Sequence, residues 1–503
     1  MNKKKIAIIL ILSFSIIIPL VAFSATFPNI YVGTRVAKTH TTAAFALELE
    51  QKLPNLMKKY RLFGGGAIAL ISNYELIWVG EFGYANEALE TPITNGTFFQ
   101  IASMSKSFCS WGVMKLYEDG LIDLDAPVDS YLTRWHLPDT GYNNSEVTIR
   151  RILSHTAGLS KPSFMGYANT NDLPTVEEAL TAEVRVIAKP GSKWMYSGGG
   201  FLLLQLLIEE VSGQNYTNYM TNEILAPLNL TNARPDWTTD IQNFSAKAYT
   251  PFGKELPMYR FTALSAGGHY STIIDLAKFV MTNMNGSAGE PPGRGVLNTS
   301  TIKLLQSKVA DVHPLMGGYG LGFQTKLLAN GQKMVYHNGQ NTGFIGTMNF
   351  IPASGEGLVI LTSCDAAKSL VVELESRWQQ MIQGTAKNTV LFSKYLITVP
   401  AIIVLSMLFI GISIWLVVSV LKSKRQLVFQ KSFPRTFTAV LLGVVLIVSM
   451  VLLYAPITYR SGFVFVYWFV PNIHWVALLL SLSLVYYLNL CLTLTKKVKR
   501  QTL

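Results

Sequence analysis

The chain has 503 residues and a formal net charge of +12, and only 14% of its residues are charged. That fraction is well below the roughly 25% found in soluble proteins. Ten basic and no acidic residues follow Tyr395, and Lys3–Lys5 add three more, so residues 6–395 carry about −1. Basic residues that flank apolar segments are typical of membrane proteins. The positive charge therefore indicates membrane flanks and excludes nucleic acid as a partner.

The N-terminus, residues 1–24, is predicted to be a signal peptide. Lys3–Lys5 form a charged region, the apolar run Ile6–Phe23 follows, and Ala22 and Ser24 are small residues of the kind that signal peptidases recognise. We expect cleavage after Ser24. An uncleaved anchor is the alternative, because the run is nearly long enough to span a bilayer. Under both interpretations, the residues that follow are exported across the membrane.

Residues 36–387 are predicted to form an α+β domain. Two short apolar runs, Ala67–Ile71 and Glu75–Val79, are separated by three residues and indicate a hairpin. Helical periodicity dominates the middle of the domain, for example at 201–211 and 273–284. Strands at both ends with helices between them predict one antiparallel sheet, closed by its termini and flanked by helices. The strands expected near the far end are Lys333–His337, Gly343–Ile351 and Gly357–Cys364.

Residues 396–503 are predicted to be a membrane domain with three transmembrane helices, at about 396–421, 437–457 and 475–494. Each segment can cross a hydrocarbon core of ~30 Å at ~1.5 Å per residue. Five basic residues lie between the first two segments and four follow the third, whereas the loop 458–474 has only Arg460. The positive-inside rule makes the first loop and the C-terminus cytoplasmic. This predicts a multi-pass protein of a bacterial inner membrane with the α+β domain on the periplasmic side.

Ser103-Met104-Ser105-Lys106 is an S-x-x-K arrangement. If it opens a helix, Ser103 and Lys106 lie on one face, so that the ammonium is beside the hydroxyl. A serine hydroxyl becomes a good nucleophile only when a neighbouring group accepts its proton. A helix N-terminus adds free N–H groups where an oxyanion would form. The arrangement alone is common, and its meaning depends on the rest of the sequence.

Tyr196-Ser197-Gly198 and His337-Asn338-Gly339 follow in that order. Together with the first arrangement they resemble the S-x-x-K, Y-x-N and K/H-x-G motifs of class C β-lactamases and of penicillin-binding-protein carboxypeptidases. The resemblance covers roughly residues 45–385. Within it, His155 is expected to hold a loop rather than to react. Further segments that match the family are Gly83–Asn86, Ile152–Leu159, Pro227–Leu230 and the stretch 266–276.

The resemblance implies a β-lactamase/transpeptidase-like fold and an acyl-enzyme mechanism. It makes Ser103 the nucleophile, Lys106 its electrostatic partner and proton acceptor, and Tyr196 the base that activates Ser103 and protonates the leaving amine. It assigns the oxyanion hole to the backbone N–H groups of Ser103 and Gln340. His337 takes the position of the usual lysine and is expected to line the substrate strand. No cluster has metal-ligand spacing, so neither a metal nor a cofactor is expected.

The sequence departs from the family at Gly198, where the second motif usually has Asn. The missing amide argues against ordinary β-lactam turnover and D-Ala-D-Ala recognition, although Gly198–Gly200 could equally serve a tight turn. The run Gly339-Gln340-Asn341 and the polar Gln100 resemble the membrane-bound peptidases that activate prodrugs, such as the colibactin-maturing and xenocoumacin-type enzymes. That group recognises an N-acyl-D-asparagine cap. The residues expected to bind substrate are therefore Gln100, Gly198, His337, Gly339 and Asn341.

The sequence thus predicts a periplasmic, membrane-anchored serine peptidase that removes an N-acyl-D-asparagine cap from an exported nonribosomal-peptide prodrug. The expected partners are the acylated prodrug, the lipid bilayer and an exporter of the prodrug. A cell-wall D-Ala-D-Ala carboxypeptidase or esterase is one open alternative. A non-catalytic penicillin-recognition sensor is the other, and the intact Ser103, Lys106 and Tyr196 argue against it.

Overall fold

The computed structural model describes residues 41–60, 62–160, 166–168, 172–313 and 317–384, and short pieces at 418, 421–422, 425–427 and 494–496. The chain divides by its internal contacts into two compact units, Gly33–Lys387 and a second unit of Met1–Val32 with Asn388–Leu503. The signal peptide and nearly all of the three predicted spans lie outside the described residues and stay predictions. Among the residues that are described, no helix combines the length and the apolar character needed to cross a membrane. The described part of the second unit contains one antiparallel strand pair, β15 (Arg425–Leu427) with β16 (Leu494–Lys496).

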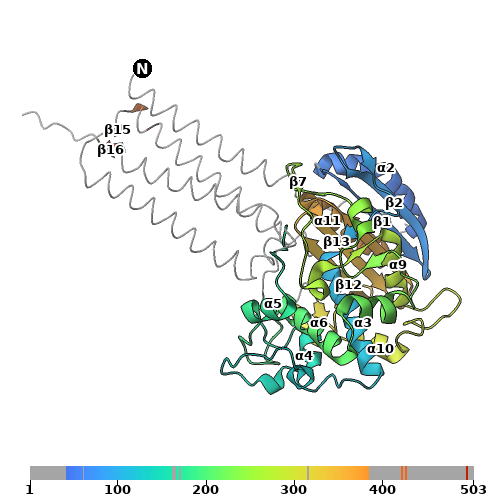
Figure 1. Cartoon of the computed structure of the whole chain (residues 1–503). Coiled ribbons are helices and arrows are strands. Elements are labelled where there is room, and N and C mark those ends of the chain that lie inside the picture. The colour runs from blue at the N-terminus through green and yellow to red at the C-terminus, as the bar shows by residue number, and fades with distance from the viewer. Residues whose placement is uncertain are drawn as a thin grey trace, which may run out of the picture. The chain divides into compact units, whose positions relative to one another are not determined.

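The first unit is built on an antiparallel sheet (Figure 1). Its strand order across the described residues is β3-β2-β1-β14-β13-β12-β11-β10-β9. β1 pairs with β14, so that Ile68 lies opposite Ile360 and the first and last long strands meet in the sheet. The sheet is complete only when both ends of the domain come together. The strands are β1 (Gly65–Ser72), β2 (Glu75–Asn86), β3 (Thr91–Pro92), β9 (Ala310–His313), β10 (Gly317–Tyr319), β11 (Gln324–Leu327), β12 (Lys333–Asn341), β13 (Phe344–Ile351) and β14 (Glu356–Thr362).

Helices cover both faces of the central strands (Figure 1). On one face, α2 (Thr42–Tyr60) and α11 (Lys368–Gln383) pack against a cluster that includes Ile68 of β1. Successive side chains of a strand point to opposite faces, and the next residue, Ala69, belongs to the larger cluster on the other face. Burial on both faces explains why β1 is a nearly continuous apolar run in the sequence.

The helical layer on the other face of the sheet is formed by the segment between β3 and β9. Its central helix, α6, is buried from Gly199 to Ile208. Ser197 caps the N-terminus of α6 by accepting a hydrogen bond from Gly200 N–H, and Gly213 ends the helix at φ +69°. The helices of this segment are α3 (Ser105–Glu118), α4 (Ile149–Leu153), α5 (Val176–Glu183), α6 (Gly198–Ser212), α7 (Tyr216–Tyr219), α8 (Thr239–Phe244), α9 (Ile273–Thr282) and α10 (Thr299–Leu305). Its short strands are β4 (Phe99–Gln100), β5 (Ala233–Arg234) and β8 (Tyr270–Ser271), which form one sheet, and β6 (Ala248–Tyr249) with β7 (Glu255–Leu256).

The predicted α+β fold, with an antiparallel sheet closed by its termini and flanked by helices, is confirmed. The predicted hairpin corresponds to β1 and β2, the three later strands to β12, β13 and β14, and the helical stretches to α6 and α9. The differences lie at the edges of the sheet, where the two-residue strand β3 on one side and β9, β10 and β11 on the other extend it beyond the predicted strands. These strands have only two to four residues each, too few for an alternating pattern to stand out.

Candidate active site

The predicted nucleophile lies in a tight turn at the start of a buried helix. Ser103 is the middle residue of the 3-10 turn η2 (Ala102–Met104), and α3 begins at Ser105. Ala102 has a φ of +51°, a conformation that residues with a side chain rarely adopt. Backbone strain of this kind persists only where the surrounding structure fixes it, and it is frequent at active sites. The structure confirms that the S-x-x-K arrangement opens a helix.

Lys106 lies beside Ser103 and is only 2% exposed. Its Nζ is 3.4 Å from Ser103 Oγ and donates a second hydrogen bond to Ala266 O. The same nitrogen lies 5.0 Å from the centroid of the Tyr196 ring and 5.6 Å from that of Phe201. A buried ammonium is costly unless hydrogen bonds and ring faces replace its hydration. A carbonyl and two aromatic rings therefore hold this cation next to the hydroxyl.

The loop before α6 brings Tyr196 to Lys106, and His155 holds that loop. Ser197 N–H donates to His155 Nδ1 over 3.1 Å, and the His155 and Tyr196 rings are 4.3 Å apart. His155 itself has a φ of +58°, a left-handed conformation that is uncommon for a residue with a side chain. This is the loop-holding role predicted for His155. Gly198, the first residue of α6, is partly exposed.

His337 of β12 is buried under the strand instead of lining it. It is 1% exposed, its Nδ1 donates to Asn338 O over 2.8 Å, and its Nε2 accepts from the Tyr319 hydroxyl over 3.1 Å. Burial, reinforced by the positive charge of Lys106, lowers the pKa of His337 to about 3. The ring is therefore neutral at physiological pH. It supports the strand next to the predicted catalytic groups and does not carry the charge of the lysine usual in the family.

Gly339 allows β12 to approach the turn that holds Ser103. A Cβ atom at this position would lie 2.3 Å from Ile101 O and 3.3 Å from Ala102 Cβ. Real Cβ atoms are never that close to a carbonyl oxygen, so only glycine fits here. The close approach brings Gln340, the next residue, towards Ser103. These are the two residues whose N–H groups were predicted to form the oxyanion hole.

Gln100 and Asn341 meet beside this turn. Asn341 Nδ2 donates to Gln100 Oε1 over 2.7 Å and to Gly267 O over 2.9 Å. Gln100 is 4% exposed, and its Nε2 donates to Tyr270 Oη and Tyr259 O. Gln100 was expected to bind substrate directly. Because its amide is buried and hydrogen-bonded within the protein, it orients Asn341 instead.

The π-helical turn η7 (Leu264–Gly268) was matched to the family by its sequence but given no role. Its carbonyls hold two of the predicted site residues, since Ala266 O accepts from Lys106 and Gly267 O accepts from Asn341. The glycines of the turn were the only signal in the sequence, and glycine does not reveal where a carbonyl points. Within the described residues, no group of three His, Cys, Asp or Glu side chains could hold a metal ion.

Comparisons with known proteins match the same part of the chain. The family model described as Beta-lactamase matches residues 49–380. Penicillin-binding protein 4* of Bacillus subtilis is 30% identical over 177 residues, which cover 34% of this chain and 37% of that protein. Protein flp of Staphylococcus aureus is 24% identical over 310 residues and 60% of each chain. The chain thus spans between about a third and three fifths of the length of these curated relatives.

Solved structures share the fold of the first unit. The octameric penicillin-binding protein homologue from Pyrococcus abyssi superimposes with a TM-score of 0.58 at 25% identity, over 68% of this chain and 78% of that one. A D-stereospecific amidohydrolase from Streptomyces sp. superimposes with a TM-score of 0.53 at 22% identity, over 67% of this chain and 98% of that one. The second likeness concerns the fold alone.

Proposed function

The chain belongs to the β-lactamase family of serine hydrolases, and from that premise we propose that it is a membrane-anchored periplasmic peptidase. Its substrate is an exported peptide prodrug, and it removes an N-acyl-D-asparagine cap from that prodrug. The reaction breaks the peptide bond on the carboxyl side of D-asparagine and proceeds through an ester on Ser103.

The proposed chemistry uses the three residues that meet at the start of α3 and α6. Ser103 Oγ attacks the D-asparagine carbonyl, and its proton passes to the pair formed by Tyr196 and Lys106. The N–H groups of Ser103 and Gln340 stabilise the oxyanion. The proton then goes to the departing amine, which leaves the acyl-enzyme. Tyr196 activates a water molecule that hydrolyses the ester and restores Ser103.

The choice of a D-asparagine cap rests on one observation, the orientation of the Asn341 side chain. Both hydrogens of its amide are directed at protein acceptors, Gln100 Oε1 and Gly267 O. Among the contacts of the described residues, its Oδ1 accepts no hydrogen bond, so this oxygen is the atom left for a ligand. An acceptor oxygen fits the NH₂ group of a D-asparagine carboxamide and repels the carboxylate of D-aspartate.

The membrane location and the partners are supported by the sequence outside the catalytic unit. Residues 396–503 are strongly apolar with basic flanks, and an acyl tail partitions into a bilayer with ~0.8 kcal/mol per buried CH₂. An anchored enzyme would therefore meet an acylated prodrug at the membrane surface, after an exporter has delivered it. The fold is compatible with D-residues, because a D-stereospecific amidohydrolase has it.

The test uses the purified full-length protein and acylated peptides with D-Asn, L-Asn, D-Asp or D-Leu at the cleavage site. The value of kcat/KM should be orders of magnitude higher for D-Asn than for L-Asn, because inversion moves the scissile carbonyl away from Ser103. Asn341→Leu should erase the preference for D-Asn over D-Leu, since an unpaired buried amide costs ~1–3 kcal/mol. Ser103→Ala, the control, should cleave none of the peptides.

Two results would replace the proposal. Release of terminal D-Ala from a peptidoglycan pentapeptide, with no hydrolysis of acyl-D-Asn peptides, would identify a cell-wall carboxypeptidase. Stable labelling by a fluorescent penicillin without turnover of any peptide would identify a sensor.

A further inference from the structure

We infer that Gln205 is a positioning residue of this reaction, because it fixes the turn η7 that holds both Lys106 and Asn341. The inference rests on the acyl-enzyme chemistry proposed above. Gln205 lies in the middle of α6, is 2% exposed and interrupts an otherwise apolar run. A buried amide in such a run is destabilising unless both of its polar atoms are hydrogen-bonded.

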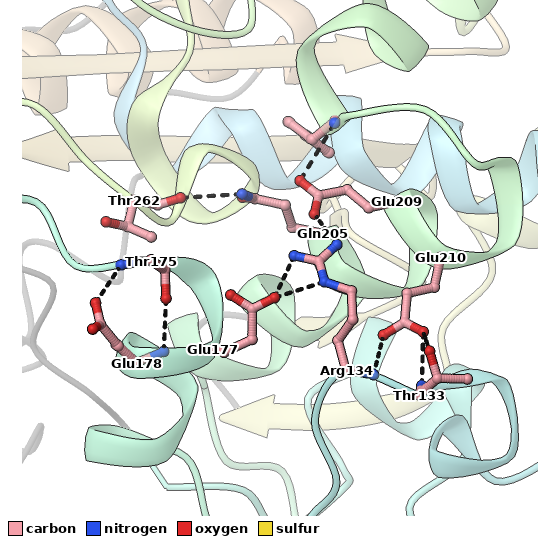
Figure 2. Close-up of polar contacts among 10 residues, drawn as sticks. Thr133, Arg134, Thr175, Glu177, Glu178, Gln205, Glu209, Glu210 and Thr262 are labelled. Carbon is pink, nitrogen blue, oxygen red and sulfur yellow. Dashed lines mark hydrogen bonds and ion pairs between the residues drawn. The ribbon is translucent and has the colours of Figure 1, made fainter.

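Both polar atoms of Gln205 bind the backbone around η7. Its Nε2 donates to Thr262 O over 3.1 Å, the contact drawn in Figure 2, and its Oε1 accepts from Ser265 N–H over 3.2 Å. A second tie joins the same two elements, since Ser265 Oγ donates to Phe201 O over 2.8 Å. The turn is therefore held to α6 at its N-terminal end, by the side-chain amide of Gln205 and by the hydroxyl of Ser265.

The position of η7 determines the positions of both Lys106 and Asn341. Ala266 and Gly267, the residues that follow Ser265, direct their carbonyls at Lys106 Nζ and Asn341 Nδ2. α6 also begins directly after Tyr196. The N-terminus of α6 thus positions the loop that contains Tyr196. The middle of α6 positions the two carbonyls that accept hydrogen bonds from Lys106 and Asn341. A shift of η7 of the order of 1 Å would be enough to lower the rate ~10²-fold.

The test measures the rate of Ser103 labelling by a fluorophosphonate in the full-length protein as a function of the concentration of the label. Gln205→Leu removes the amide from η7. The matched control is Gln306→Leu, because Gln306 is also buried (3% exposed) and its Nε2 donates to a backbone carbonyl, Asn283 O, over 2.8 Å. Both variants lose a buried hydrogen-bonding amide and should lose similar stability.

Gln205→Leu should be labelled at least ~10-fold more slowly than the wild type. The loss should lie in the maximal labelling rate and not in the concentration of label that gives half of that rate, because a displaced Lys106 slows the reaction of Ser103. Gln306→Leu should keep the wild-type rate within about twofold. Unchanged labelling in folded Gln205→Leu, or an equal loss of maximal rate in Gln306→Leu, would overturn the inference.

Ser265→Ala provides a milder variant if Gln205→Leu does not fold. It removes the second hydrogen bond between η7 and α6 and should lower the maximal labelling rate in the same way, and an unchanged rate would overturn the inference. Labelling by a fluorophosphonate requires no D-asparagine. Failure of the wild type to cleave acyl-D-Asn peptides would therefore reject the proposed substrate and leave the role of Gln205 to be decided by the labelling rates.

Discussion

At the scale of single residues, the site depends on how closely β12 approaches the turn that holds Ser103. A Cβ atom on Gly339 would lie 2.3 Å from Ile101 O. Gly339→Ala should therefore push β12 away and lower kcat/KM by at least ~10²-fold, because Gln340 N–H, the proposed donor to the oxyanion, would be displaced. Gly96→Ala is the matched control, since its Cβ would have no neighbour closer than Thr94 Oγ1 at 3.8 Å. Similar activity in the two variants would contradict the close-approach argument.

The sequence predicts these residues unevenly. Ser103, Lys106 and Tyr196 could be found because their motifs have fixed spacing and order, and the structure brings them together. The burial of His337 and the role of Gln100 could not be found in this way. Both depend on partners far away in the chain, Tyr319 for one and Tyr270 for the other. No local pattern in the sequence specifies which distant residues will pack against a strand, or on which of its faces they will lie.

At the scale of elements, two buried histidines are expected to make the first unit, Gly33–Lys387, less stable in acid. His269, just before β8, hydrogen-bonds to the Tyr216 hydroxyl over 3.0 Å, and His337 of β12 to that of Tyr319. Burial lowers the pKa of each to about 3, and Lys106 adds to the effect at His337. Below pH 6.5 the unfolded chain therefore binds protons that the folded unit does not. The free energy of unfolding falls as the pH decreases.

Asp365, at the start of the turn before α11, opposes this trend. Burial raises its pKa to about 6, so the folded unit keeps a proton that the unfolded chain releases. Between pH 4 and 6 the unfolded chain therefore binds roughly one proton more than the folded unit, because the two histidines outweigh the one aspartate. The free energy of unfolding should fall by about 1.4 kcal/mol for each pH unit of acidification. Urea unfolding of the full-length protein, followed by tryptophan fluorescence at pH 7 and 5, measures the difference. His269→Gln should reduce it, and equal stability at the two pH values would contradict the argument.

At the scale of the whole molecule, both ends of the domain could be recognised as strands, but their pairing was inferred from order alone. β1 pairs with β14 across almost 300 residues, with Ala67 opposite Leu361. Such a pairing leaves no local signal in the sequence, whereas the alternation and burial of each strand do. The short edge strands β9–β11 lack even that signal, so the width of the sheet could not be predicted.

The charge distribution of the whole chain predicts its topology. The ten basic residues after Tyr395 lie mainly in the loop 422–435 and the tail 496–500, whereas residues 6–395 are close to neutral. Lys and Arg are retained on the cytoplasmic side during insertion. Reporter fusions after Lys424 and after Arg500 should therefore be active only as cytoplasmic reporters. A fusion at Lys387 should be active only as a periplasmic reporter. A C-terminus on the periplasmic side would require an even number of spans after the catalytic unit, and the predicted three spans would then be wrong.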